Sequence, residues 1–187
     1  MTARELIDFL GIVEKLKCAT RHCITTSGRQ ESVAEHSWRL AAMAMLCAGE
    51  VPEADIDRVI KLCLVHDFGE AITGDIPTFI KTDGDRDVEE NAIEGMIASL
   101  PEREREELRG LFREMSEMKT PEAKLTKALD KLEALISHNE ADISSWLPLE
   151  YDLQLTYGQS ECSEFRFTHE LRDEVYKDSV RKNRENR

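Results

Sequence analysis

Apolar residues recur at every third or fourth position along most of this chain, which is the spacing that places them on one face of an α-helix. Leu6, Phe9 and Val13, near the start of the chain, follow this spacing. No segment shows the sustained alternation of apolar and polar residues that is typical of a β-strand. We therefore predict an all-α protein with helices over residues 3–17, 32–47, 52–66, 86–100, 102–118, 121–140, 145–156 and 164–182.

Particular residues mark some of the helix boundaries. Ser32 and Glu35 form a capping-box motif directly before an apolar segment, and Pro52 and Pro121 stand at two further helix starts. Residues 18–31 lose the helical spacing and contain a glycine, so we predict a loop there. The stretch LCLVHDFGEAITGD, residues 62–75, runs from an apolar helix end into a short turn of helix and a loop.

Length and composition define the class of protein. The 187 residues suffice for one domain with a full core, and the 41% apolar and 34% charged content fits a soluble globular protein. No interior linker is visible, so we predict a single domain over residues 1–187, with residues 141–187 of unassigned role. The net charge of −13 argues against a nucleic-acid polymer as a partner, because such a surface repels phosphate backbones. A small phosphorylated ligand stays compatible with it.

The cysteines and the N-terminal sequence bear on the compartment. The five cysteines include no Cys-x-x-Cys motif, and Cys47 and Cys63 lie within apolar helical segments, so we interpret them as reduced core residues. The first ten residues, MTARELIDFL, contain acidic residues and no signal-peptide core. The longest apolar run is about ten residues, too short to span a bilayer. We therefore expect a soluble, cytoplasmic protein without a membrane partner.

Histidine and aspartate residues stand on helical faces that the apolar spacing places in the core. His36 lies three residues after Val33 and four before Leu40, so it shares their buried stripe. His66 and Asp67 follow directly on an apolar helix end. A carboxylate in such a place must be paired, hydrogen-bonded or bound to a cation.

Asp130 occupies a comparable position in the helix predicted over 121–140, among small residues opposite the main apolar face. Two imidazoles and two carboxylates form a ligand set that suits Zn, Fe, Mn, Co or Ni, and helix bundles build metal sites from such inward side chains. We predict that one divalent metal ion neutralises this set. The alternative for each residue alone is a hydrogen-bonded structural role. The four predicted ligands are His36, His66, Asp67 and Asp130.

The order of these ligands resembles the His…His-Asp…Asp pattern of the HD-domain superfamily of metal-dependent phosphohydrolases. The segments ESVAEHSWRLAAMA, LVHDFGEAITGDIPTF and KALDKLEAL resemble its 5′-deoxynucleotidase branch, and the likeness covers residues of about 6–140. It implies an HD-type helical bundle that holds Mn, Co, Fe or Zn in its core. It also implies a small nucleotide substrate, release of phosphate from (deoxy)nucleoside 5′-monophosphates, and a homodimer.

The resemblance further implies roles for residues outside the ligand set. Glu70 matches the family's catalytic glutamate, Asp75 its substrate-contacting aspartate, and Arg21 its phosphate-orienting arginine. On this basis Glu70 accepts a proton from the attacking water, and Asp75 either holds the sugar hydroxyl or protonates the leaving oxygen. In the family a tryptophan follows the arginine directly or nearly so. In this chain His22 follows Arg21 instead, and we expect it to contact the substrate together with Arg21 and Asp75. Without the tryptophan, the selectivity between deoxyribose and ribose cannot be predicted.

Other functions remain open at this point. The same site could serve another phosphorylated small molecule or nucleotide. A di-iron centre would need further ligands between Asp67 and Asp130, where no histidine occurs. A non-catalytic helical adaptor, with histidines and aspartates that only satisfy one another, would leave Glu70, Asp75 and Arg21 unexplained.

The remaining histidines and cysteines suggest no second site. A zinc clip formed by Cys18, His22 and Cys23 would lack a fourth ligand and would place an arginine beside the ion. His138 and His169 are predicted to be structural or surface residues.

Overall fold

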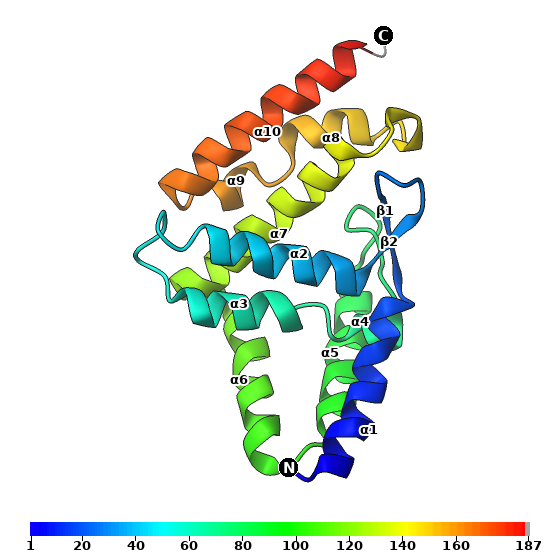
Figure 1. Ribbon diagram of the computed structural model, residues 1–187, viewed down its shortest axis with the longest axis vertical. Helices are drawn as coiled ribbons and strands as arrows, with labels where there is room; N and C mark the ends of the chain where they lie inside the picture. The colour runs from blue at the N-terminus through cyan, green and yellow to red at the C-terminus, as the bar shows by residue number, and fades with distance from the viewer. Residues whose placement is uncertain (186–187) are drawn as a thin grey trace.

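The structure, a computed structural model, describes the backbone of residues 1–185 and their side chains other than those at positions 83 and 86. It is mostly helical (Figure 1), and the all-α prediction is confirmed apart from one short hairpin. The elements follow in the order α1 (Ala3–Val13), the 3-10 turn η1 (Glu14–Lys17), β1 (Thr20–Ile24), β2 (Gln30–Ser32), α2 (Val33–Leu46), α3 (Ile56–Val65), α4 (Glu70–Thr73), α5 (Asp83–Ile97), α6 (Glu102–Glu117), α7 (Pro121–Glu140), the 3-10 turn η2 (Ile143–Ser145), α8 (Glu150–Thr156), α9 (Gln159–Cys162) and α10 (Arg166–Glu185).

The prediction of a loop over residues 18–31 is wrong, because most of this segment forms the antiparallel hairpin β1–β2. Its strands have only five and three residues, too few for an alternating pattern to stand out. The turn between them closes through hydrogen bonds between Thr25 and Arg29, and Gly28 has a φ of +83°. Glycine adopts this left-handed conformation without steric cost.

The capping residues explain where the helices begin. The box at Ser32 and Glu35 is present as predicted, with the Ser32 side chain accepting from the Glu35 N–H. The helix expected from residue 52 begins at Ile56 instead, because the Asp55 side chain caps it by accepting from two backbone N–H groups. In the same way Thr82 starts α5 three residues earlier than predicted.

Three helices form the centre of the molecule. In Figure 1, α2 and α3 lie across α7, with α1, α5 and α6 on one side and α8 to α10 on the other. The core that they share contains Cys47 and Cys63, which are buried and free, as predicted. Full burial of one leucine or valine side chain contributes about 1.5–3 kcal/mol. The fully buried members of this core include Leu40, Val59, Leu125, Leu129 and Leu132.

Residues 141–185 pack onto this centre as a second layer. Helix α10 runs along α7 and α8, and α9 contacts α7. Arg172 of α10 donates hydrogen bonds to the backbone oxygens of Gln154 and Tyr157, which fixes the end of α8. Within residues 1–185 no helix combines the length and the apolar content needed to cross a membrane.

The carboxylate of Glu35 stabilises the start of α2, and this contribution depends on pH. It accepts hydrogen bonds from the Ser32 N–H and from Arg29 at 2.9 Å each. The Arg29 guanidinium and the Ser32 N–H lower the pKa of Glu35 from 4.5 to about 2. A carboxyl whose pKa is lower in the folded state stabilises fully above its unfolded pKa, so this contribution is lost as the pH falls from 4.5 towards 2.

We predict that Glu35→Gln lowers the free energy of unfolding by about 1 kcal/mol at neutral pH, as expected for a weakened helix cap. The difference between variant and wild type should shrink below pH 4.5. Urea unfolding of both proteins at neutral pH and at about pH 3.5 measures this difference in free energy. The other titratable groups are common to both proteins, so their contributions cancel in the difference. A difference that stays constant across this range contradicts the prediction.

Candidate active site

Four side chains from three parts of the chain meet at one point in the core. His36 comes from α2, His66 and Asp67 directly follow α3, and Asp130 comes from α7. The Nε2 atoms of His36 and His66 lie 3.3 Å apart, and Asp67 Oδ2 is 2.9 Å from the latter. Asp130 Oδ1 lies 3.4 Å from His36 Nε2. Ligands about 2.0–2.2 Å from one ion lie about 3–4 Å from each other, so this spacing fits one metal ion.

The hydrogen bonds of the two imidazoles turn the same nitrogen of each ring toward this point. His36 Nδ1 donates to Glu133 Oε2 at 2.5 Å, and His66 Nδ1 donates to the Cys63 carbonyl oxygen at 2.9 Å. In the neutral rings the Nε2 lone pairs therefore face each other and two carboxylates. A proton or a metal ion must supply positive charge at this point. Burial and Arg21 lower the pKa of His36, but the hydrogen bonds with Asp130 and Glu133 outweigh them and raise it to about 10, so a metal ion that binds here displaces a proton.

Helix geometry explains why these residues converge. His36 is fully buried on the face of α2 that also carries Val33 and Leu40, as its spacing predicts. Helix α3 ends at Val65, so His66 becomes the C-terminal cap and the chain turns directly after it. Gly69 completes this turn against α5, where an added Cβ would come within 2.6 Å of a side-chain carbon.

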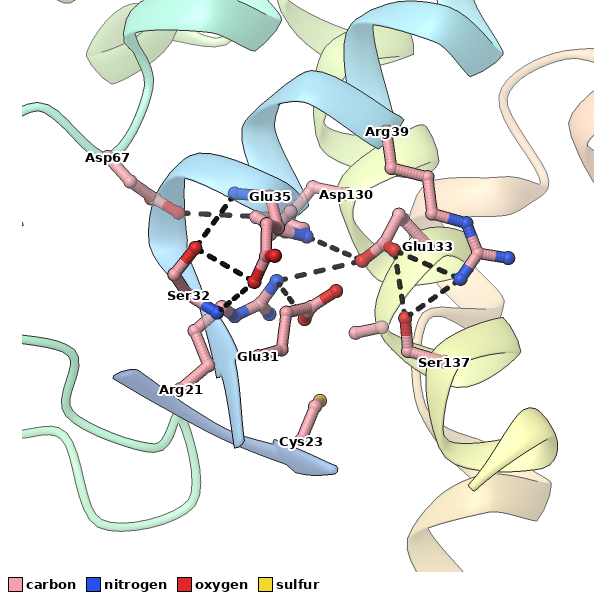
Figure 2. Close-up of polar contacts among 12 residues, drawn as sticks. Arg21, Cys23, Glu31, Ser32, Glu35, Arg39, Asp67, Asp130, Glu133 and Ser137 are labelled. Atoms are coloured by element: carbon pink, nitrogen blue, oxygen red, sulfur yellow. Dashed lines mark hydrogen bonds and ion pairs between the residues drawn. The ribbon is translucent and has the colours of Figure 1, made fainter. Parts of the chain in front are cut away.

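Glu133 lies at the centre of the buried polar network and was not among the residues predicted from the sequence. Figure 2 shows its carboxylate between Arg21, Arg39 and Ser137. It is fully buried and accepts from Ser137 Oγ at 2.8 Å in addition to His36. Its position three residues after Asp130 places it on the same side of α7, which is the sequence signal that could have revealed it.

Glu70 and Asp75 lie beside the cluster and line the same cavity. Glu70 is buried, and its Oε2 makes no hydrogen bond to any described residue. Burial, with the charges of Asp67 and Asp75 added, raises the pKa of Glu70 to about 9. Burial also raises the pKa of Asp75, although Arg21 opposes it. A positive charge bound at this point would therefore lower the pKa values of both carboxyls.

The cavity has a volume of about 650 Å³ and passes from the cluster to α8. Although the chain has a net charge of −13, cations from four positions border this cavity. Lys127 Nζ lies 3.2 Å from Asp130 Oδ2, and Lys131 Nζ lies 4.3 Å from the centre of the Tyr157 ring. The cationic side chains are Arg21, Lys81, Lys127 and Lys131.

An irregularity in the hairpin brings neighbouring residues of β1 to the cavity. Thr20 pairs with Ser32 and Ile24 with Gln30, so β1 has more residues than β2 between these pairs. Such bulges redirect side chains. Both Arg21 and His22 line the cavity as a result, although adjacent residues of a regular strand point to opposite faces.

The zinc clip is not formed in the structure. Cys18 is exposed, whereas Cys23 is buried with its Sγ 3.3 Å from His138 Nδ1. His22 Nε2 instead lies 3.0 Å from Glu150 Oε1. Two of the three residues of the clip therefore have other partners.

His138 lies in the cavity wall, where its ring is hydrogen-bonded on both sides, in agreement with the structural role predicted for it. Its Nε2 is 2.8 Å from Glu150 Oε1, and both residues line the cavity. His169, in contrast, is exposed as expected. Glu150, together with Leu153 and Gln154 of α8, forms part of the wall, so residues 141–185 contribute directly to the cavity.

Comparison with known proteins agrees with this geometry. A family model described as an HD domain matches residues 13–168. The 5′-deoxynucleotidase HDDC2 of Homo sapiens is 36% identical over 142 residues, which are 74% of this chain and 69% of that protein. The 5′-deoxynucleotidase hdd1 of Schizosaccharomyces pombe is 28% identical over 174 residues, which are 89% of this chain and 81% of that protein.

A solved structure shows the same fold over nearly the whole chain. The predicted metal-dependent phosphohydrolase from Magnetospirillum magnetotacticum MS-1 superposes with a TM-score of 0.80 at 26% identity. The match covers 96% of this chain and 93% of that one. The chain belongs to the HD-domain family, and within it to the branch of the 5′-deoxynucleotidases.

We predict that Glu133→Gln weakens binding of a divalent metal ion about 10–100-fold, because glutamine removes the charge that holds the Nδ1–H of His36. Competition with a chelator measures the affinity, and circular dichroism shows that the helices persist. Glu140→Gln is the matched control, because Glu140 is also in α7 and accepts from Arg39 at 2.7 Å but is half exposed. Equal affinities of the two variants would show that Glu133 does not orient His36.

Proposed function

We propose that this chain is a metal-dependent phosphohydrolase that releases phosphate from (deoxy)nucleoside 5′-monophosphates. The observation that carries the proposal is the convergence of two imidazole Nε2 atoms and two carboxylates beside a buried glutamate and a cation-lined cavity. The similarity to proteins named 5′-deoxynucleotidase supports the same reaction and substrate class.

The proposed metal ligands are His36, His66, Asp67 and Asp130, and their mixed nitrogen and oxygen donors suit Mn, Co, Fe or Zn. One such ion fits the interatomic distances of the cluster. When bound, it would polarise a phosphoryl oxygen and lower the pKa of a water molecule.

Glu70 is the proposed general base. Its buried Oε2 makes no hydrogen bond to a described residue, so it can accept one from the attacking water. Burial, with the charges of Asp67 and Asp75 added, raises its pKa to about 9. Glu70 therefore acts as a base only when those charges are neutralised, which ties its function to the occupied cluster.

Arg21 is the proposed phosphate ligand. Its side chain is largely buried in the cavity wall, 3.5 Å from Glu31 and 3.6 Å from Glu133, and its Nη1 makes no hydrogen bond to a described residue. These carboxylates hold the guanidinium in place, and its planar donors match phosphate oxygens. Asp75 lies near Arg21, where it holds the sugar hydroxyl or protonates the leaving 5′ oxygen.

The assembly and the location of the protein are also proposals. We infer that residues 1–187 act as one domain, because α8 and the metal-site helices border one cavity. The five cysteines are free, which supports a reducing, cytoplasmic environment. A homodimer is supported by exposed apolar residues of α2, in which Trp38 and Met45 are 69% and 58% exposed at a spacing of seven residues.

Phosphate release from metal-stripped protein tests the proposed reaction. With added Mn²⁺ or Co²⁺ we expect release from deoxynucleoside 5′-monophosphates, and Glu70→Gln should lower kcat about 10²–10⁴-fold by removing the proton acceptor. Glu161→Gln, which changes another glutamate of the cavity wall, should leave kcat unchanged. Absence of release with every metal would refute the nucleotidase and favour another phosphorylated substrate or the adaptor.

The dimer is tested by mass measurement in solution. We expect twice the chain mass of 21.4 kDa from light scattering on a sizing column, and a monomer for Trp38→Glu because a charge cannot be buried in an apolar interface. Leu64→Glu, on an exposed position of α3, serves as the control. A monomeric wild type at micromolar concentration contradicts the dimer.

A further inference from the structure

Two imidazoles and one carboxylate outside the proposed metal ligands meet in the cavity wall. His22 comes from β1, His138 from α7 and Glu150 from α8, and all three line the cavity. The Nε2 atoms of His22 and His138 lie 3.0 and 2.8 Å from Glu150 Oε1, and one atom of each side chain lies within 4.8 Å of the others. Ligands about 2.0–2.2 Å from one ion lie about 3–4 Å from each other, so the three side chains can hold an ion with small adjustments.

Hydrogen bonds from other groups orient two of these side chains toward the common point. Glu150 Oε2 accepts from the Leu147 N–H at 2.6 Å, which leaves Oε1 facing the two imidazoles. His138 Nδ1 lies 3.0 Å from the Ala134 carbonyl oxygen and 3.3 Å from Cys23 Sγ. Because a carbonyl oxygen can only accept, this Nδ1 carries a proton. Histidines that bind metal ions donate their other ring N–H in the same way, which directs the free nitrogen at the ion.

The buried carboxylate of Glu150 needs a positive charge beside it. Burial raises the pKa of Glu150, but hydrogen bonds from His138 and the Leu147 N–H outweigh this and lower it. Burial lowers the pKa of His138, but hydrogen bonds with Cys23 and Glu150 outweigh this and raise it to about 10. A proton on His138 therefore matches the charge of Glu150, and a metal ion that binds here takes the place of that proton.

The types of ligand select the class of ion. Mg²⁺ and Ca²⁺ favour oxygen ligands, whereas two imidazole nitrogens and one carboxylate oxygen are a set that binds zinc, with a fourth position for water. All three side chains line the cavity, so the fourth position opens to it. This set contains one carboxylate, and the set around His36 contains two. The ion should therefore be bound more weakly here than by the four ligands proposed above.

We propose that His22, His138 and Glu150 form a second metal site, which binds Zn²⁺ more weakly than the first site. The proposal does not rest on the proposed reaction, because none of the three residues belongs to the first ligand set. The ligands come from β1, α7 and α8. A bound ion therefore links the hairpin and residues 141–185 to the centre of the molecule.

Equilibrium dialysis of the metal-stripped full-length protein against increasing Zn²⁺, followed by metal analysis, counts the ions bound per chain. For wild type we expect two ions, the second of which binds at a higher free Zn²⁺ concentration. His22→Gln should weaken binding of the second ion at least tenfold, because it removes an imidazole ligand. The His22 side chain is 29% exposed, so this variant should keep its fold, which circular dichroism checks.

Glu150→Gln is the second variant, because it removes the charged ligand and should weaken the same ion at least tenfold. His169→Gln, which changes an exposed histidine of α10, should still bind both ions. Asp130→Asn should weaken only the tightly bound ion, so the two sites are tested separately. The inference is overturned if wild type saturates at one ion per chain, or if the second ion binds with unchanged affinity in His22→Gln or in Glu150→Gln.

Discussion

A carboxylate that is fully buried in a helical core must be matched by hydrogen bonds and positive charge, and Glu133 meets this condition through residues of the site itself. It accepts from His36 and Ser137, and the guanidinium groups of Arg21 and Arg39 lie within 3.7 Å. One buried charge thus sets the tautomer of a proposed metal ligand and holds the proposed phosphate ligand. The orientation of both depends on the packing of α7 against α2 and β1.

Carboxylates in the cavity wall are also matched by positive charge and hydrogen bonds. Asp130 is contacted by Lys127 and Lys131, and Glu150 by His22 and His138, so these two carboxylates of the wall have cationic or imidazole partners. The overall charge of −13 therefore does not prevent binding of an anionic substrate, because cations are concentrated where the phosphate is proposed to bind. Helix α8 is needed to complete this wall.

The parts of the site that could be predicted from sequence are those fixed by helical spacing. The burial of His36 follows from its distance to Val33 and Leu40, and the capping box at Ser32 fixed the start of α2. The position of Glu150 could not be predicted, because its contact with His22 joins residues far apart in the chain.

Sequence patterns also failed to predict features that depend on contacts between distant parts of the chain. Glu133 lies three residues after Asp130, but its charge is typical of a helix surface, and its complete burial results from the packing of α2 onto α7. The hairpin is too short for an alternating pattern, and its irregular pairing, which brings Arg21 and His22 to one cavity, depends on the register with β2.

The central claim is that His36, His66, Asp67 and Asp130 form a centre for one metal ion, and the number of ions bound per chain tests it most directly. Metal-stripped wild type and Asp130→Asn would each be titrated calorimetrically with Mn²⁺ or Zn²⁺. The account predicts one tightly bound ion per wild-type chain and at least a tenfold weaker affinity in the variant, which loses a charged ligand. Wild type that binds no ion stoichiometrically, or a variant with unchanged stoichiometry and affinity, would contradict it.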